Sequence, residues 1–218
     1  MSSEYPAACG GDPLFMNEFY IIALAHILAL ISPGPDTIIT IKNALVSRKN
    51  GIFTSFGIGI GNLFHIIASM LGLGLLISQS VLLYSIIKYI CGVYLIYLGY
   101  KAFKSTTKFE MGKEINNLKN TKTKNSIFEG MLNSILNPKV TLFYFALFSQ
   151  VVSVQTTDQT KMFYALYLFV ATVLYFTIVS IFLNFKPVRN VLQKVFGYIE
   201  KITGAVLVLL GFKVILEK

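Results

Sequence analysis

The stretch Ser32-Pro33-Gly34-Pro35-Asp36 interrupts an apolar segment at about 19–45, and Asn137-Pro138-Lys139 interrupts a second one at about 127–152. Ser and Asn are preferred N-cap residues, and Pro is favoured at the first position of a helix. Each stretch therefore predicts a helix that breaks and restarts within its apolar segment. In lipid, such a break is tolerated only where other protein or a water-filled cavity satisfies the backbone.

The composition is that of a membrane protein. Of 218 residues, 55% are hydrophobic and 13% are charged, against about 25% charged in a typical soluble domain. The mean hydropathy is +0.66. These values exclude a disordered chain, a collagen-like or coiled-coil protein and an ordinary soluble enzyme. Because one span requires about 20 apolar residues, the chain has room for about six spans and for no additional soluble domain.

The apolar segments predict an all-α membrane protein with six transmembrane helices, of which the first and the fourth are broken by proline. Polar residues 78–80 place the turn between the second and third helices near residue 79. Residues 1–15 predict a polar N-terminal tail, which is acidic and therefore unlike the basic start of a signal peptide. The six predicted helices cover about 19–45, 52–77, 81–102, 127–152, 162–185 and 195–216.

Basic residues predict the orientation of these helices. The net charge is +9, and 14 of the 19 Lys and Arg residues lie in or beside the loops between helices one and two, three and four, and five and six. By the positive-inside rule, these loops are cytoplasmic and both termini lie outside. The segment at about 104–126 is then a cytoplasmic linker. Because topology explains the basic residues, we expect no nucleic-acid partner.

The two halves of the sequence share features at matching positions. The third predicted helix contains Gly92 and Gly99, the sixth contains Gly204 and Gly211, and in both an aromatic residue and a lysine follow the second glycine. The proline breaks also occupy matching helices, the first and the fourth. Halves of three helices must insert with opposite orientation, so this pattern predicts two inverted three-helix repeats. Inverted repeats with discontinuous helices are typical of transporters with a site near the membrane midplane.

Two charged side chains lie at the breaks. A carboxylate within a span, such as Asp36, is costly and is a functional-site candidate; the alternative is an acid that stabilises the first turn of a half-helix. Lys139 occupies the first turn of the other half-helix, where the helix dipole disfavours a cation. Three compensations are open to it: a pair with Asp36, an anionic ligand, or extension to the membrane interface.

The second predicted helix carries small and polar residues on one face. Gly57, Gly61 and His65 recur every four residues, a spacing that favours close helix packing. Asn62 precedes His65 by three residues, so both side chains can face one cavity. His65 is either a proton-relay group or a hydrogen-bonded core histidine, and the sequence leaves both alternatives open.

Together these motifs resemble the LysE/RhtB family of bacterial amino-acid exporters. Beyond the two breaks and the second-helix spacing, the resemblance includes Phe128 and Gly130 before the fourth-helix break, Leu142-Phe143-Tyr144 after it, and the glycines of the last helix. It covers about residues 17–215. The fifth helix departs from the family pattern, because it lacks the expected glycines and tryptophans; this difference bears on substrate choice.

The resemblance implies a transporter domain at 16–218 that exports amino acids or their derivatives across the bacterial inner membrane, coupled to protons. The expected partners are the amino acid, protons and membrane lipid, and both a monomer and a homo-oligomer fit the pattern. A channel or an assembly factor without active transport is the alternative function. The residues expected to form the substrate path are Ser32, Pro33, Gly34, Pro35, Asp36, Asn62, His65, Asn137, Pro138 and Lys139.

The sequence contains no arrangement typical of an enzyme or a cofactor protein. Neither of the two histidines, His26 and His65, belongs to a Ser/His, paired-Asp or HEXXH constellation. Cys9 lies in the polar tail and Cys91 in an apolar segment, so we expect neither a structural disulfide nor a zinc site. We therefore expect no enzymatic activity, no cofactor and no metal ion.

Overall fold

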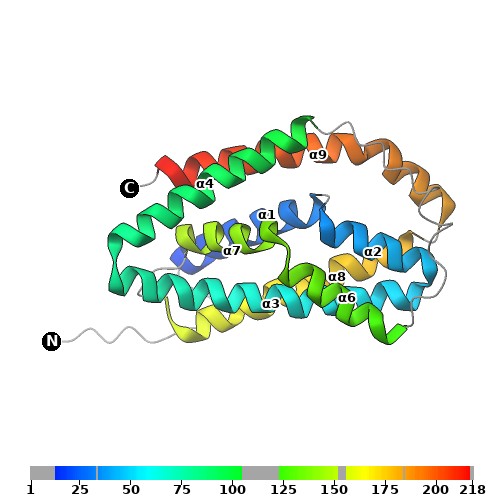
Figure 1. The fold of residues 1–218 in the computed structure, drawn as a ribbon, viewed down its shortest axis with the longest axis horizontal. Coiled ribbons are helices and arrows are strands. Elements are labelled where there is room, and N and C mark those ends of the chain that lie inside the picture. Colours follow the sequence, from blue (N-terminus) through cyan, green and yellow to red (C-terminus); the bar gives the residue numbers. More distant parts are fainter. Residues whose placement is uncertain (1–12, 33, 105–122, 152–155, 184, 217–218) are drawn as a thin grey trace.

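The protein folds into α-helices, as predicted. The structure is a computed structural model that describes residues 13–32, 34–104, 123–151, 156–183 and 185–216. Within these residues it contains eight helices (Figure 1). They are α1 (Pro13–Ile31), α2 (Pro35–Val46), α3 (Arg48–Gln79), α4 (Val81–Lys104), α6 (Thr123–Ile135), α7 (Pro138–Val151), α8 (Asp158–Phe182) and α9 (Lys186–Leu216).

Both predicted breaks are present. The first predicted helix is divided into α1 and α2 and the fourth into α6 and α7, and the predicted turn near residue 79 separates α3 from α4. By length and composition, three of the described helices, α3, α4 and α8, could each cross a membrane, as could the pair α1–α2 if its two helices, bent by 56°, form one span. The count of six spans and the inverted repeat remain predictions.

The two broken helices run in opposite directions. In Figure 1, α1 and α7 lie on one side of the breaks, and α2 and α6 lie on the other. Along α2, Asp36 contacts Asn133 of α6, whereas the later Asn43 contacts the earlier Glu129. This order of contacts is antiparallel. It places the break of each helix beside the break of the other.

The largest buried cluster lies between α1, α3, α7 and α8. Its members include Ile22, Ile66, Tyr144 and Leu168, all of them fully buried. Beside it, α3 approaches α6 very closely, because glycines remove the intervening side chains. A Cβ atom built on Gly130 of α6 would lie 2.5 Å from a backbone oxygen of α3. This contact holds α6 against α3 just before the second break.

The helices α4 and α9 pack against each other along one edge of the molecule (Figure 1). The four glycines of the predicted repeat form this contact in reciprocal pairs. A Cβ atom on Gly99 would lie 2.5 Å from the carbonyl oxygen of Gly204, and one on Gly211 would lie 2.6 Å from the carbonyl oxygen of Gly92. Small residues at such a contact let two helix backbones approach closely. The repeated motif therefore has a packing role.

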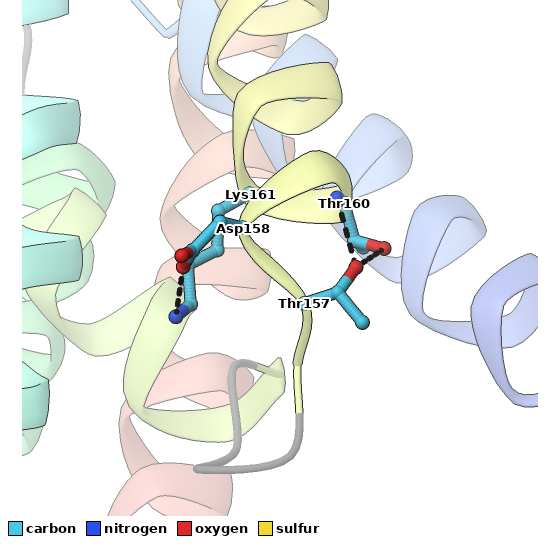
Figure 2. A network of polar contacts seen from close by, with 4 residues as sticks. All are labelled: Thr157, Asp158, Thr160 and Lys161. Atoms are coloured by element: carbon cyan, nitrogen blue, oxygen red, sulfur yellow. Dashed lines mark hydrogen bonds and ion pairs between the residues drawn. The ribbon is translucent and has the colours of Figure 1, made fainter. Parts of the chain in front are cut away.

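Figure 2 shows why α8 begins earlier than predicted. The Thr157 hydroxyl accepts a hydrogen bond from the backbone N–H of Thr160 at 3.3 Å, and Lys161 Nζ lies 3.1 Å from Asp158 Oδ1. An N-cap threonine and an acid in the first turn both stabilise a helix start. The prediction of a start at residue 162 was wrong, because it followed the apolar residues alone. The helix begins at Asp158 and ends at Phe182.

Three further helices also begin before their apolar segments. The helix α3 begins at Arg48 instead of residue 52, because the Ser47 hydroxyl accepts from the backbone N–H of Asn50 at 3.1 Å. The helix α6 begins at Thr123 instead of 127, and α9 begins at Lys186 instead of 195. Polar residues at a helix end extend the helix without raising its hydropathy, so apolar runs mark the spans and not the helix ends.

The N-terminal helix starts within the predicted polar tail. Helix α1 begins at Pro13. The Phe15 ring stacks on the ring of Tyr164 in α8 with centroids 5.8 Å apart. Residues 1–12 and 105–122, which make up most of the predicted tail and of the predicted cytoplasmic linker, lie outside the described residues.

Candidate functional site

The ends of four half-helices meet at one place. Lys139, in the first turn of α7, donates from Nζ to the carbonyl oxygen of Ser32, just after α1, at 3.0 Å. Asn133, near the end of α6, donates from Nδ2 to Oδ1 of Asp36 in the first turn of α2, at 2.7 Å. These contacts join residues 107 and 97 positions apart. They bring the two breaks into one site.

The two restarting helices are capped differently. Asn137 precedes α7, and its Oδ1 accepts from the backbone N–H of Lys139 at 3.1 Å, which confirms the predicted cap. For α2, the prediction of Ser32 as the N-cap with the following proline at the first position was wrong. Gly34 is the N-cap, Pro35 follows at the start of the helix, and no side chain caps the first turn. Because Gly34 has no side chain, the N–H groups of this turn stay free of a side-chain cap.

Asp36 is buried at the junction and has several partners. Its residue is 7% exposed. Besides accepting from Asn133, its carboxylate interacts with the side chain of Asn137 and with the charge of Lys139. The described contacts include no direct ion pair between Asp36 and Lys139; the Lys139 ammonium group donates to the Ser32 carbonyl. The Lys139 ammonium group and the Asp36 carboxylate thus lie in the same site without a direct ion pair between them.

A cavity with an empty volume of about 420 Å³, including the space at its mouth, lies where the breaks meet. Six of the expected path residues line it, namely Ser32, Gly34, Asp36, Asn62, Asn137 and Lys139. Pro35 and Pro138 are not among the lining residues, and Pro33 lies outside the described residues. The remaining lining residues are His26, Ala29, Leu30, Thr37, Val140, Phe143, Tyr144 and Phe176.

His65 does not line the cavity, although Asn62 does. Its Nε2 lies 3.1 Å from the carbonyl oxygen of Ser134, and its Nδ1 lies 3.2 Å from the hydroxyl of Thr141. The ring therefore joins α3 to α6 and α7, and both nitrogens have partners. This geometry fits a hydrogen-bonded core histidine, and the proton-relay role stays a prediction.

Sequence reasoning missed two residues of the site. Asn133 belongs to the fourth-helix motif, but nothing in the motif indicates that it binds Asp36. His26 lies in an apolar segment before the first break, and its ring is 1% exposed and lines the cavity. No spacing to the break indicates this role, because six residues turn a helix by about 600° and so leave His26 roughly 120° away from Ser32 around the helix.

Comparison with known proteins agrees with the family resemblance seen in the sequence. The LysE type translocator family matches residues 27–218 of this chain. The chain is 34% identical over 203 residues to the uncharacterized membrane protein YrhP of Bacillus subtilis (strain 168), covering 88% of this chain and 95% of that protein. It is 28% identical over 204 residues to the threonine efflux protein of Escherichia coli (strain K12), covering 92% of this chain and 98% of that protein. No solved structure matches the chain.

Proposed function

This chain belongs to the LysE type translocator family, and we propose that it exports amino acids or their derivatives across the bacterial inner membrane, coupled to protons. It is a multi-pass membrane protein and a transporter rather than an enzyme. Relatives named threonine efflux proteins support a small amino acid as the substrate. The cavity at the two breaks is the proposed substrate site.

The observation that carries this proposal is the placing of Asp36 and Lys139 in one cavity. A free amino acid holds an ammonium and a carboxylate group on one carbon, so its carrier needs an anionic and a cationic group close together. We assign the ammonium group to Asp36. We assign the carboxylate to Lys139 and to the uncapped N–H groups that begin α2, since helix N-termini bind anions.

The placing of the cavity suits alternating access. It lies between half-helices that extend away from it in opposite directions, α1 and α7 on one side and α2 and α6 on the other (Figure 1). Discontinuous helices of this kind surround the binding sites of many secondary transporters. We propose that movement of these half-helices exposes the cavity to each side of the membrane in turn.

An export assay with matched variants tests the proposal. Cells loaded with a threonine-containing dipeptide are compared for the threonine that appears outside, with and without the protein. We expect Asp36→Asn and Lys139→Met each to abolish the added efflux at an unchanged amount of protein in the membrane. The controls are Asp158→Asn and Lys161→Met, the same changes at the exposed pair in Figure 2, which should retain efflux. No added efflux from the wild type would contradict the proposal.

A rival explanation is that Asp36 and Lys139 serve only to neutralise each other. The exchange of the two charges, Asp36→Lys with Lys139→Asp, separates the two ideas. If mutual neutralisation were their sole role, the exchanged pair should restore efflux. A substrate site should not recover, because the reversed charges cannot hold the same zwitterion in the same pose. Full recovery would therefore refute the assignment of these residues to the substrate.

A further inference from the structure

A second polar contact joins α2 to α6 outside the cavity. Asn43 of α2 is fully buried, and its Nδ2 donates to Oε2 of Glu129 in α6 at 3.2 Å. The same Nδ2 donates to the hydroxyl oxygen of Thr54 in α3 at 2.8 Å. Glu129 is half-buried and does not line the cavity. The proposed function gives this carboxylate no role.

This contact repeats the one at the cavity with the two groups exchanged. At the cavity, the acid Asp36 lies on α2 and its amide partner Asn133 on α6; here the amide Asn43 lies on α2 and the acid Glu129 on α6. Asn43 follows Asp36 by seven residues, which is about 10 Å along a helix axis. Two carboxylates therefore follow each other along the α2–α6 contact, and Glu129 is the one nearer the turn between α2 and α3 (Figure 1).

The half-helices that lead away from the cavity have different buried faces. Of the six buried residues of α2, four are polar, namely Asp36, Thr37, Thr40 and Asn43. On the other side of the breaks, the buried face of α7 has one polar side-chain group, the Tyr144 hydroxyl. Its other members are Phe143, Ala146, Leu147, Phe148 and Val151. A zwitterion that leaves water is stabilised only where polar groups replace its hydration, and α2 supplies such groups.

The groups around Glu129 favour a cation. The Thr54 hydroxyl donates its proton to the carbonyl oxygen of Asn50 at 2.8 Å, so it accepts from the Asn43 amide, as the Glu129 carboxylate does. The Asn43 Oδ1 has no partner among the described residues, and none of the described basic side chains pairs with Glu129. Acceptor oxygens thus outnumber donors at this contact. An ammonium group, which carries only donors, supplies what is missing.

We propose that Glu129 is an entry station, where the ammonium group of the substrate binds before it passes to Asp36. This inference rests on the proposed function and adds a second site for the same part of the amino acid. In the predicted orientation the α2–α3 turn is cytoplasmic, and an exporter collects its substrate on that side. The polar buried face of α2 joins the entry station to the cavity.

Counterflow in vesicles of uniform orientation tests each face of the protein separately. Inside-out and right-side-out membrane vesicles are loaded with unlabelled threonine, and the initial entry of labelled threonine is measured over a range of external concentrations. A cysteine introduced by Arg48→Cys, in a chain without Cys9 and Cys91, identifies the vesicles in which the α2–α3 turn faces the medium. The measured quantity is the half-saturating threonine concentration at each face, which is independent of the amount of active protein.

The substitution Glu129→Gln removes the charge and keeps an oxygen that can accept from Asn43. We expect the half-saturating concentration to rise about fivefold at the face of the α2–α3 turn, the upper range for one exposed ion pair, and to change less than about twofold at the opposite face. Glu129→Asp should stay close to the wild type. The control is Asp158→Asn, the loss of an exposed acid at the start of α8 (Figure 2), which should leave the value at the α2–α3 face unchanged.

A measurement on the wild type needs no variant. Salt screens a partly exposed contact more than a buried one. Raising the salt concentration to about 0.5 M should therefore raise the half-saturating concentration about twofold at the α2–α3 face, and less at the opposite face. An equal response at both faces would overturn the entry station.

The outcomes separate this inference from the function on which it rests. No counterflow by the wild type at either face would overturn the proposed function, and the entry station with it. Counterflow that requires Asp36 but has the same half-saturating concentrations in the wild type and in Glu129→Gln would leave the proposed function standing and overturn the role of Glu129. An equal rise at both faces in Glu129→Gln would also overturn that role, because the loss of an entry station affects one face.

Discussion

Asp36 illustrates how a buried carboxylate is accommodated at the start of a half-helix. An ionised side chain in a span is costly unless charges, dipoles or hydrogen bonds compensate it. Here the compensation comes from the Asn133 amide, from Asn137, from the charge of Lys139 and from the start of α2. The Asn133 hydrogen bond is short, at 2.7 Å, as expected for an ionised acceptor.

This geometry predicts a measurable coupling between Asn133 and Asp36. Asn133→Ala should lower the free energy of unfolding by about 1–3 kcal/mol, because it leaves a buried charged acceptor without its donor. In a background that already carries Asp36→Asn, the same change should cost less, with a coupling of about 1 kcal/mol. Thermal unfolding in detergent is measured for the purified wild type, for Asn133→Ala, for Asp36→Asn and for the double variant, which together form a double-mutant cycle. Equal losses of unfolding free energy in both backgrounds would contradict the hydrogen bond between Asn133 and Asp36.

At the scale of helices, glycine determines how closely α3 and α6 pack. A Cβ atom on Gly57 would overlap the carbonyl oxygen of Ile127, which is backbone and cannot rotate away. We therefore expect Gly57→Ala to destabilise the protein by about 1–3 kcal/mol or more through overpacking. The control is Gly72→Ala in the same helix, where a Cβ atom would meet nothing within 4 Å. A similar unfolding midpoint for both variants would refute this account of the contact.

The elements differ in how well the sequence predicted them. Both breaks were predictable, because Pro35 and Pro138 cannot continue a helix and each lies in an apolar segment. The helix starts at Arg48 and Asp158 were not predicted, since Ser47 and Thr157 act through single capping bonds that hydropathy does not register. The glycines at matching positions of the two halves predicted a repeat, but only the structure shows that the glycines of α4 contact those of α9.

At the scale of the molecule, the sequence indicated part of the site and missed the rest for a physical reason. Asp36 and Lys139 are conspicuous because a charge in an apolar segment demands an explanation. Asn133 and His26 are ordinary polar residues whose roles depend on partners 97 and 118 positions away. No local pattern encodes such distances. His65, which local spacing favoured, instead bonds to Ser134 and Thr141 outside the cavity.

The predicted orientation of the molecule can be tested by cysteine labelling in intact cells. With the buried Cys91 replaced by alanine, the native Cys9 should react with a membrane-impermeant thiol reagent, because the positive-inside rule places the N-terminus outside. A cysteine introduced by Ile115→Cys, in a chain without Cys9, should react only after the cells are opened. Labelling of position 115 from outside intact cells would contradict the predicted orientation.

The account as a whole depends on the claim that an amino acid binds and crosses at the cavity of the two breaks. The most direct measurement is the initial rate of threonine efflux from proteoliposomes over a range of internal concentrations, for the wild type and for Asp36→Asn. We expect the wild-type rate to saturate, because each turnover uses one site, and the variant rate to fall at least about tenfold, the effect of losing one charge-assisted contact. A rate that rises in proportion to concentration and is the same in both proteins would contradict the account.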